Sequence, residues 1–124
     1  MVSIIDNNTV GLLSLALDAA AMRQQAIAHN IANANTPGFQ RIGVSFESRI
    51  AELKQAVQEG RAPSLAGLAD YRPVFEAASA AGEPVALDME MAALSENTLH
   101  HQALLKALNK QFAMIGSAIN EGKR

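Results

Sequence analysis

Cysteine and tryptophan are both absent from this 124-residue chain. Without cysteine, the chain has no disulfide, no thiolate ligand for zinc and no thiol nucleophile. Aromatic residues are also scarce, at 4% of the chain, although hydrophobic residues reach 49%. Because alanine and leucine supply much of that hydrophobic fraction, the composition favours closely packed helices over a β-sandwich or β-barrel.

An excess of charge of either sign is missing too. The formal net charge is -2, and the only basic run is the terminal pair Lys123-Arg124. This charge balance provides no basic patch of the kind that binds nucleic acid. The sequence also contains no phosphate-binding glycine loop and no nucleophile elbow. We therefore predict a protein that is not an enzyme and that uses no cofactor, no metal and no small-molecule substrate.

Long hydrophobic runs are lacking as well. The most apolar stretch, residues 12–31, is interrupted by Asp18, Arg23 and His29, which makes it too polar for a transmembrane helix. Residues 1–6 contain neither a positively charged segment nor a long apolar run, so no ordinary secretion signal is predicted.

What the chain does contain is a helical pattern at each end. After a flexible lead at residues 1–8, small and apolar residues recur at spacings of three and four, which predicts a helix with a wide apolar face. One row along the apolar face of this N-terminal helix contains Leu12, Leu15, Ala19, Met22, Ala26 and His29.

The C-terminal pattern is longer and more regular. Its spacings alternate between four and three for more than four heptads, which is typical of a coiled-coil seam. The seam consists of Leu87, Met91, Leu94, Thr98, His101, Leu105, Leu108, Phe112, Ile115 and Ile119.

The middle of the chain is less regular. Residues 44–59 form a predicted short amphipathic helix that Ser45 begins and Gly60 ends, with Phe46 and Leu53 on its apolar face. Residues 61–84 show no sustained period and several proline and glycine residues, so we expect a mobile loop.

These elements predict a mainly α fold in which long N- and C-terminal helices pair as a coiled coil. We divide the single domain into an N-terminal assembly helix at 1–35, a turn, short helix and mobile loop at 36–86, and a C-terminal coiled-coil helix at 87–124. One helix pair with a mobile insert makes a small core. We therefore expect a marginal monomer whose apolar seams are completed by other subunits.

The stretch at residues 32–41 ends the first helical pattern. Asn33 and Asn35 tolerate the left-handed conformation that ends many helices. Pro37 and Gly38 suit the central positions of a type II turn, after which Phe39 folds back as an apolar plug.

The histidines allow two interpretations. His29 and His101 each fall on a seam, where they could form a metal or pH-sensitive site between helices. No carboxylate or cysteine lies at ligand spacing beside them. We favour polar seam positions that fix the helix register.

Two segments resemble bacterial flagellar rod and hook proteins. The first combines Asn30, Asn33, Ala34, Asn35, Thr36, Pro37, Gly38 and Phe39 directly after an N-terminal helix. The second, residues 87–97 followed by Leu99 and residues 102–104, is similar to the proximal rod subunits of that family.

This resemblance implies a structural rod subunit that polymerises through its terminal helices in the flagellar basal body. It also implies export without a cleaved signal peptide into the periplasmic rod. The implied partners are other rod subunits, basal-body ring and export-gate proteins, and further copies of the chain. Composition and periodicity alone also allow a soluble coiled-coil adaptor or chaperone that binds a partner helix, and a small histidine metalloprotein rests only on the three histidines.

Overall fold

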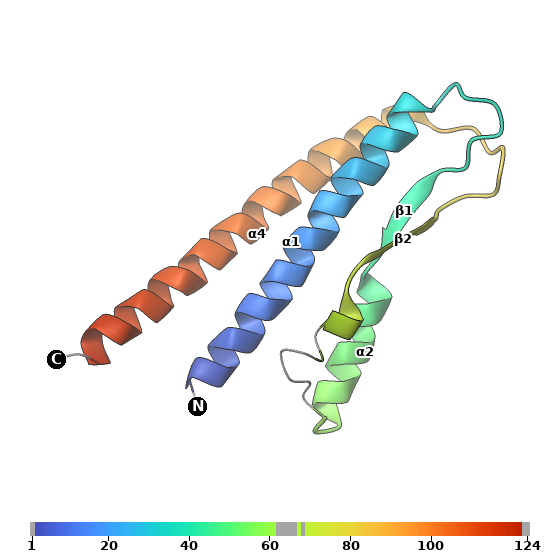
Figure 1. Cartoon of the computed structure of the whole chain (residues 1–124). Helices are drawn as coiled ribbons and strands as arrows, with labels where there is room; N and C mark the ends of the chain where they lie inside the picture. The colour runs from blue at the N-terminus through green and yellow to red at the C-terminus, as the bar shows by residue number, and fades with distance from the viewer. Residues whose placement is uncertain (1, 62–66, 68, 123–124) are drawn as a thin grey trace.

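The computed structural model describes residues 2–61, 67 and 69–122. Two long helices dominate the fold (Figure 1), so the chain is mainly α, as the sequence predicts. The elements in chain order are α1 at Val2–Ala32, β1 at Ile42–Ser45, α2 at Glu47–Gln58, the 3-10 helix η1 at Ala69–Tyr71, β2 at Val74–Ala77 and α4 at Leu87–Gly122.

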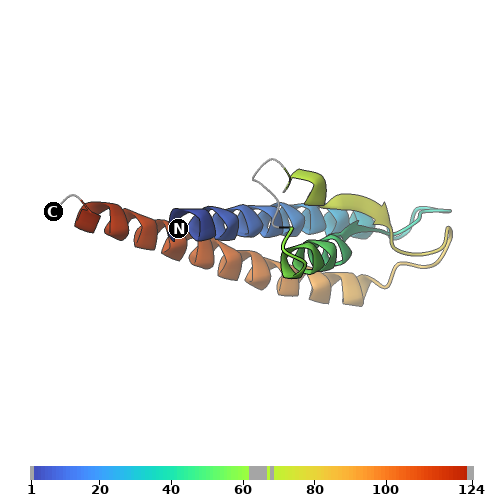
Figure 2. The same ribbon diagram turned by 90° about the horizontal axis from the view of Figure 1, so that it is seen from below.

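The long helices α1 and α4 run antiparallel, and they lie side by side in both ribbon views (Figures 1 and 2). Both chain termini lie at one end of this helical arm, and the loops that lead into β1 and α4 lie at the other end. The two-stranded sheet of β1 and β2, together with α2, packs on α1 (Figure 1). Within the described residues, no helix combines the length and the apolarity needed to cross a membrane.

The start of α1 differs from the prediction. The flexible lead expected at residues 1–8 is helical from Val2 onward. The segment before Gly11 contains no proline or glycine that would break a helix. The polar residues Asn8 and Thr9 resemble an N-cap in sequence, yet they lie inside the helix.

The middle segment is also more ordered than predicted. Val44 and Ser45, expected in a helix, belong to β1, which pairs antiparallel with β2 in a two-stranded sheet. β2 lies inside the stretch predicted as a mobile loop, residues 61–84; of that stretch, residues 62–66 and 68 are outside the described part. The pairing sets Gly43 opposite Glu76 and Val44 opposite Phe75. Such long-range pairing overrides local helix preference, and local periodicity cannot reveal it.

Helix α2 ends as the sequence predicts. Gly60 adopts a positive φ of 78°, and the amide of Arg61 donates to the carbonyl of Ala56 at 2.8 Å, which is a Schellman-type stop. The start of α2 differs from the prediction. The carbonyl of Phe46, not that of Ser45, accepts the first helical hydrogen bond, from the amide of Ile50. The Ser45 hydroxyl lies 3.3 Å from that of Ser48.

The largest apolar cluster joins α1 to α2. Leu15 and Ala19 of α1 are buried against Phe46 and Leu53, with Tyr71 packed at the margin. This cluster holds α2 across the middle of α1 and leaves the α4 side of α1 for a separate contact.

Candidate assembly surface

The row of α4 that packs on α1 is turned relative to the predicted seam. The buried and half-buried positions follow spacings of four and three, as in a coiled coil. The row contains Glu90, Leu94, Asn97, His101, Leu104, Leu108, Gln111 and Ile115, and the half-buried small residues Ala93, Ala107 and Gly116 flank it.

The predicted seam is therefore split between two faces. Leu94, His101, Leu108 and Ile115 belong to the row that packs on α1. The remaining seam positions lie on the next flank and are exposed, with side chains 40% to 56% accessible to solvent; these are Leu87, Met91, Leu105, Phe112 and Ile119, and Thr98 is exposed beside them. Within one chain the packing row differs from the predicted seam, because polar residues occupy four of its eight positions, Glu90, Asn97, His101 and Gln111.

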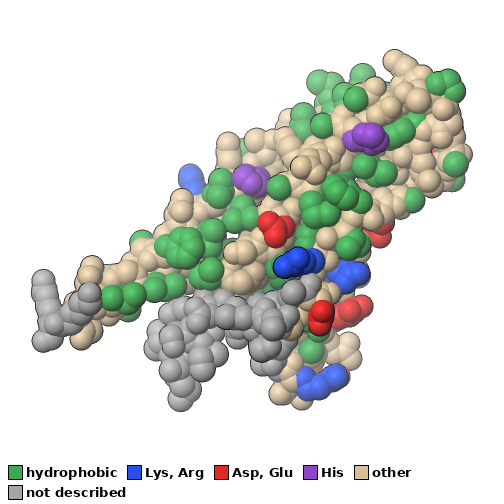
Figure 3. Space-filling model, viewed as in Figure 1, with side chains coloured by type: hydrophobic (Ala, Val, Ile, Leu, Met, Phe, Trp, Pro, Cys, Tyr) green, Lys and Arg blue, Asp and Glu red, His purple; other side chains and the backbone are tan. Residues whose placement is uncertain are grey.

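The N-terminal seam residues also have different environments. Leu15 is buried in the cluster with α2, Met22 is half-buried and Leu12 is exposed. In the face seen in Figure 3, green side chains lie along the α1–α4 arm, whereas charged side chains gather around α2. The arm thus presents apolar surface that the fold of one chain leaves uncovered.

We call the exposed flank of α4 the apolar ridge and define it by Leu87, Met91, Leu105, Phe112 and Ile119. The residues are separated by four, fourteen, seven and seven positions in turn, so they line one side of the helix. The ridge extends over almost the full length of α4.

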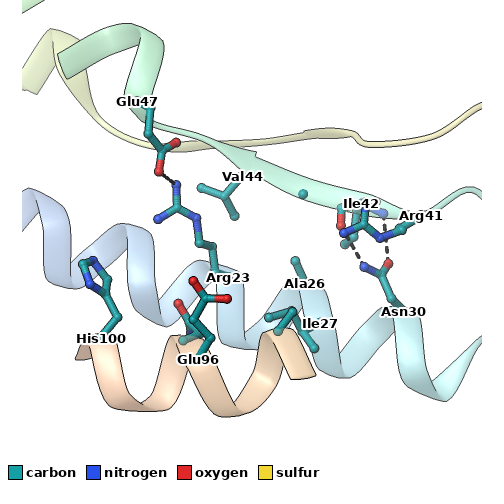
Figure 4. Close-up of a pocket in the computed structure, with 13 residues that line it drawn as sticks. Arg23, Ala26, Ile27, Asn30, Arg41, Ile42, Val44, Glu47, Glu96 and His100 are labelled. Carbon is teal, nitrogen blue, oxygen red and sulfur yellow. Dashed lines mark hydrogen bonds and ion pairs between the residues drawn. The ribbon is translucent and has the colours of Figure 1, made fainter. Parts of the chain in front are cut away.

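Asn30 is the largest fully buried side chain, with 1% exposure. Its Nδ2 donates to the carbonyl oxygen of Ile42 at 2.8 Å, and its Oδ1 accepts from the amide of Ile42 at 2.9 Å. The side chain therefore pairs with β1 as a neighbouring strand would (Figure 4). The Nδ2 also lies 3.4 Å from Oε2 of Glu90.

Glu90 completes this contact from the first turn of α4. Glu90 is 2% exposed and forms an ion pair with Arg41. A buried carboxylate requires such partners. Asn30, Arg41, Ile42 and Glu90 thus join the end of α1, the start of β1 and the start of α4, and we call them the polar clasp.

A second polar contact lies two turns further along α4. Asn97 is buried, and its Nδ2 donates to the carbonyl of Ala20 at 2.8 Å and to Oε1 of Gln24 at 2.8 Å. Gln24 in turn lies 3.5 Å from the Thr98 hydroxyl. These directional bonds fix the register of α4 against α1.

The turn that follows α1, residues 33–39, positions the polar clasp. The Phe39 amide donates to the Thr36 carbonyl at 3.2 Å, and Gly38 has a φ of 74°, so Pro37 and Gly38 occupy the centre of the predicted type II turn. Phe39 folds back with its ring centroid 5.4 Å from that of His29.

Asn33 and Asn35 have a different role from the one that the sequence predicts. Neither Asn33 nor Asn35 adopts a positive φ. Asn33 instead donates from Nδ2 to the His29 carbonyl at 2.9 Å and accepts from the Thr36 hydroxyl at 3.2 Å. The backbone amide of Ala34 donates to the carbonyl of Ile31 at 3.3 Å, which forms a further turn at the end of α1. Helix α1 therefore ends through successive turns, without a left-handed residue.

The histidines are spread along the arm. His29 lies at the turn end, and His101 is half-buried on the packing row of α4. Among the described residues, no group of three histidine, aspartate or glutamate side chains is placed to hold a metal ion.

Sequence reasoning missed Arg41, Glu90, Asn97 and Gln24 as structural residues. One signal could have found two of them. Glu90 and Asn97 continue the spacing of Leu94 and His101, and polar residues at such core positions usually have a buried partner.

The family model described as "Flagella basal body rod protein" matches residues 13–40. The flagellar basal body rod protein FlgB of Escherichia coli K12 is 32% identical over 127 residues, covering 86% of this chain and 89% of the relative. FlgB of Proteus mirabilis is 31% identical, with 93% and 96% covered. FlgB of Bacillus subtilis is 26% identical, with 94% and 97% covered.

Proposed function

The chain belongs to the FlgB family of flagellar basal-body rod proteins, and from that premise we propose that it polymerises through its terminal helices in the proximal rod. It is a structural subunit of the basal-body rod, in a family known for structure and not for catalysis. The observation that carries the polymerisation proposal is the apolar ridge of α4.

The energetics of the ridge support assembly. Full burial of a leucine, isoleucine, phenylalanine or methionine side chain is worth roughly 1.5–3 kcal/mol. Leu105, Phe112 and Ile119 keep about half of their surface in water within one chain. A row of exposed apolar side chains on one side of a helix is typical of an interaction site. Several partly exposed side chains along one helix give each subunit a substantial gain on association.

The environment of a rod subunit follows from the family. Members of a basal-body rod assemble with themselves and with other basal-body components. We infer that the neighbours of this chain include other rod subunits and the ring or export-gate proteins at the base. We also infer a periplasmic location after export without a cleaved signal peptide.

Complementation of swimming tests the proposal. In a bacterium that lacks its own FlgB, expression of this chain should restore swimming. Leu105→Asp should abolish the rescue at unchanged protein level, because a charge in the ridge opposes burial between subunits. Ser117→Asp places the same charge on another exposed position of α4 and should retain swimming. Normal swimming with Leu105→Asp would contradict assembly through the ridge.

A further inference from the structure

The two edges of the β1–β2 sheet differ in their hydrogen bonding. On the β1 edge, the amide and the carbonyl of Ile42 both bind the side chain of Asn30. On the other edge lies β2, Val74–Ala77, whose four residues are all exposed to solvent. No third strand joins the sheet within the described residues. One edge is therefore closed by a side chain of α1, and the other is open.

The strand register shows where the backbone groups of β2 point. The amide of Ala78 donates to the carbonyl of Arg41 at 2.8 Å, which makes these two residues a hydrogen-bonded pair. Such pairs alternate along an antiparallel ladder. Glu76 therefore bonds to β1, whereas the amides and carbonyls of Phe75 and Ala77 point away from it. Within the described residues, no hydrogen bond reaches these outward groups. Their spacing matches the donors and acceptors of one more extended chain.

The side chains of β2 define the chemistry of a strand that adds at this edge. An antiparallel strand would form hydrogen-bonded pairs with Phe75 and Ala77, so the residue opposite Glu76 would lie in the closer, non-hydrogen-bonded pair. Glu76 is exposed, and it forms no ion pair within the part of the chain that the structure describes. Opposite charges across such a pair stabilise a sheet, and like charges destabilise it. Phe75 is 48% exposed, so an apolar neighbour on the added strand would cover it.

A second copy of β2 does not fit this edge. Antiparallel pairing of Phe75 with Ala77 of the other copy places the two Glu76 carboxylates directly opposite each other. A shift that pairs Phe75 with its own counterpart sets Ala77 opposite Pro73, which has no amide to donate. The opposite shift sets Phe75 against Ser79, whose carbonyl already accepts a side-chain hydrogen bond at 2.7 Å. Each register thus brings a repulsion or a hydrogen-bonding partner that is missing or already engaged.

We propose that the β2 edge binds an extended segment of a different protein, with a basic residue opposite Glu76 and an apolar residue opposite Phe75. This chain offers no such segment within its described residues. Its basic residues outside the helices are Arg41, held in the polar clasp, Arg61, paired with a neighbouring glutamate, and Arg72, which precedes a proline. Since β2 and the apolar ridge lie on different elements, this inference does not depend on polymerisation through the ridge.

Binding of a designed peptide tests the β2 edge. The capped peptide Thr-Thr-Val-Lys-Val-Thr-Thr is added to the isotope-labelled full-length chain, and exchange of backbone amides with deuterium is followed by NMR. With saturating peptide, the amides of Phe75 and Ala77 should exchange at least about tenfold more slowly, because the added strand takes up their hydrogen bonds. The amide of Glu76 already bonds to β1, so its exchange rate should change little.

A charge swap separates recognition by Glu76 from the effect of net charge. Replacing the central lysine of the peptide by glutamate should weaken binding by about fivefold, and Glu76→Lys should reverse this preference. Glu121→Lys makes the same change in net charge at an exposed position near the end of α4, and it should keep the preference for lysine. Ala77→Pro removes one outward amide and no bond to β1, so it should abolish binding without changing the unfolding midpoint.

Three results would overturn the proposal: unchanged exchange of Phe75 and Ala77 with the lysine peptide, full binding by Ala77→Pro, or a reversed preference in Glu121→Lys as well as in Glu76→Lys. Exchange is also measured without peptide at rising protein concentration. Slower exchange of Phe75 and Ala77 in that series would assign the edge to a second copy and would overturn its assignment to a different protein.

Discussion

The two halves of α4 have different structural roles, although both read as one coiled-coil pattern in the sequence. In the first half, Glu90 and Asn97 are buried and hydrogen-bonded to Arg41, directly before β1, and to groups on α1. In the second half, Leu105, Phe112 and Ile119 remain substantially exposed. Polar bonds thus fix the helix within one chain, and we propose that the exposed apolar side chains form the contacts between chains.

The largest expected effect on stability comes from removing the centre of the polar clasp. Asn30→Ala should lower the free energy of unfolding by about 3 kcal/mol, because the backbone amide and carbonyl of Ile42 both lose their hydrogen-bond partner in a part-buried contact. Urea denaturation followed by circular dichroism measures this change. The exposed Asn35→Ala should cost less than about 0.5 kcal/mol. Equal effects from the two variants would remove the distinction between the clasp and the surrounding loop.

The ion pair of the clasp sharpens the comparison further. Arg41→Gln and Glu90→Gln should each destabilise the fold, and the double variant should destabilise it by about 1–2 kcal/mol less than the sum. The reason is that Arg41→Gln leaves the buried Glu90 carboxylate without its cation, a cost that is absent when position 90 is also neutral. A double-mutant cycle in urea gives this coupling energy, and a value near zero would show that the pair does not hold the two segments together.

Two glycines should respond in opposite directions. Gly38→Ala should destabilise the fold by about 1 kcal/mol, because its φ of 74° disfavours a side chain. Gly116→Ala should stabilise it by about 0.5–1 kcal/mol, because this glycine lies inside α4 with open space at its Cβ position. Thermal unfolding measures both changes, and a loss at Gly116 would indicate that the second half of α4 needs a flexible position.

The smallest effect is expected at His101. His101→Gln should change the free energy of unfolding by less than about 0.5 kcal/mol, because the residue is a half-buried polar position on the packing row. A chelator should leave the unfolding midpoint unchanged. Tight binding of one zinc ion per chain that this substitution abolishes would instead support a metal site.

Local signals in the sequence predicted part of this structure. The turn at Gly38, the end of α2 at Gly60 and the presence of two long helices all depend on neighbouring residues. The strand β1 and the rotation of α4 depend on distant ones. Glu90 resembles a solvated residue in a first helical turn until Arg41, 49 positions away, is known to contact it.

The candidate site was predicted to a similar extent. The pattern located the apolar residues of α4, but it merged the row that packs on α1 with the exposed ridge. The two rows overlap because spacings of four and three place Leu94, His101, Leu108 and Ile115 at the boundary between them. Only the buried partners of Glu90 and Asn97 decide which side of the helix faces α1.

A matched pair of substitutions one turn apart in α4 tests the division of roles most directly. Leu108 lies on the row that packs on α1, and Phe112 lies on the ridge. Leu108→Ser should lower the free energy of unfolding by about 2 kcal/mol. Phe112→Ser should lower it by less than about 1 kcal/mol and abolish self-association in sedimentation. Equal destabilisation by the two variants, or normal association of Phe112→Ser, would contradict the assignment of the ridge to contacts between chains.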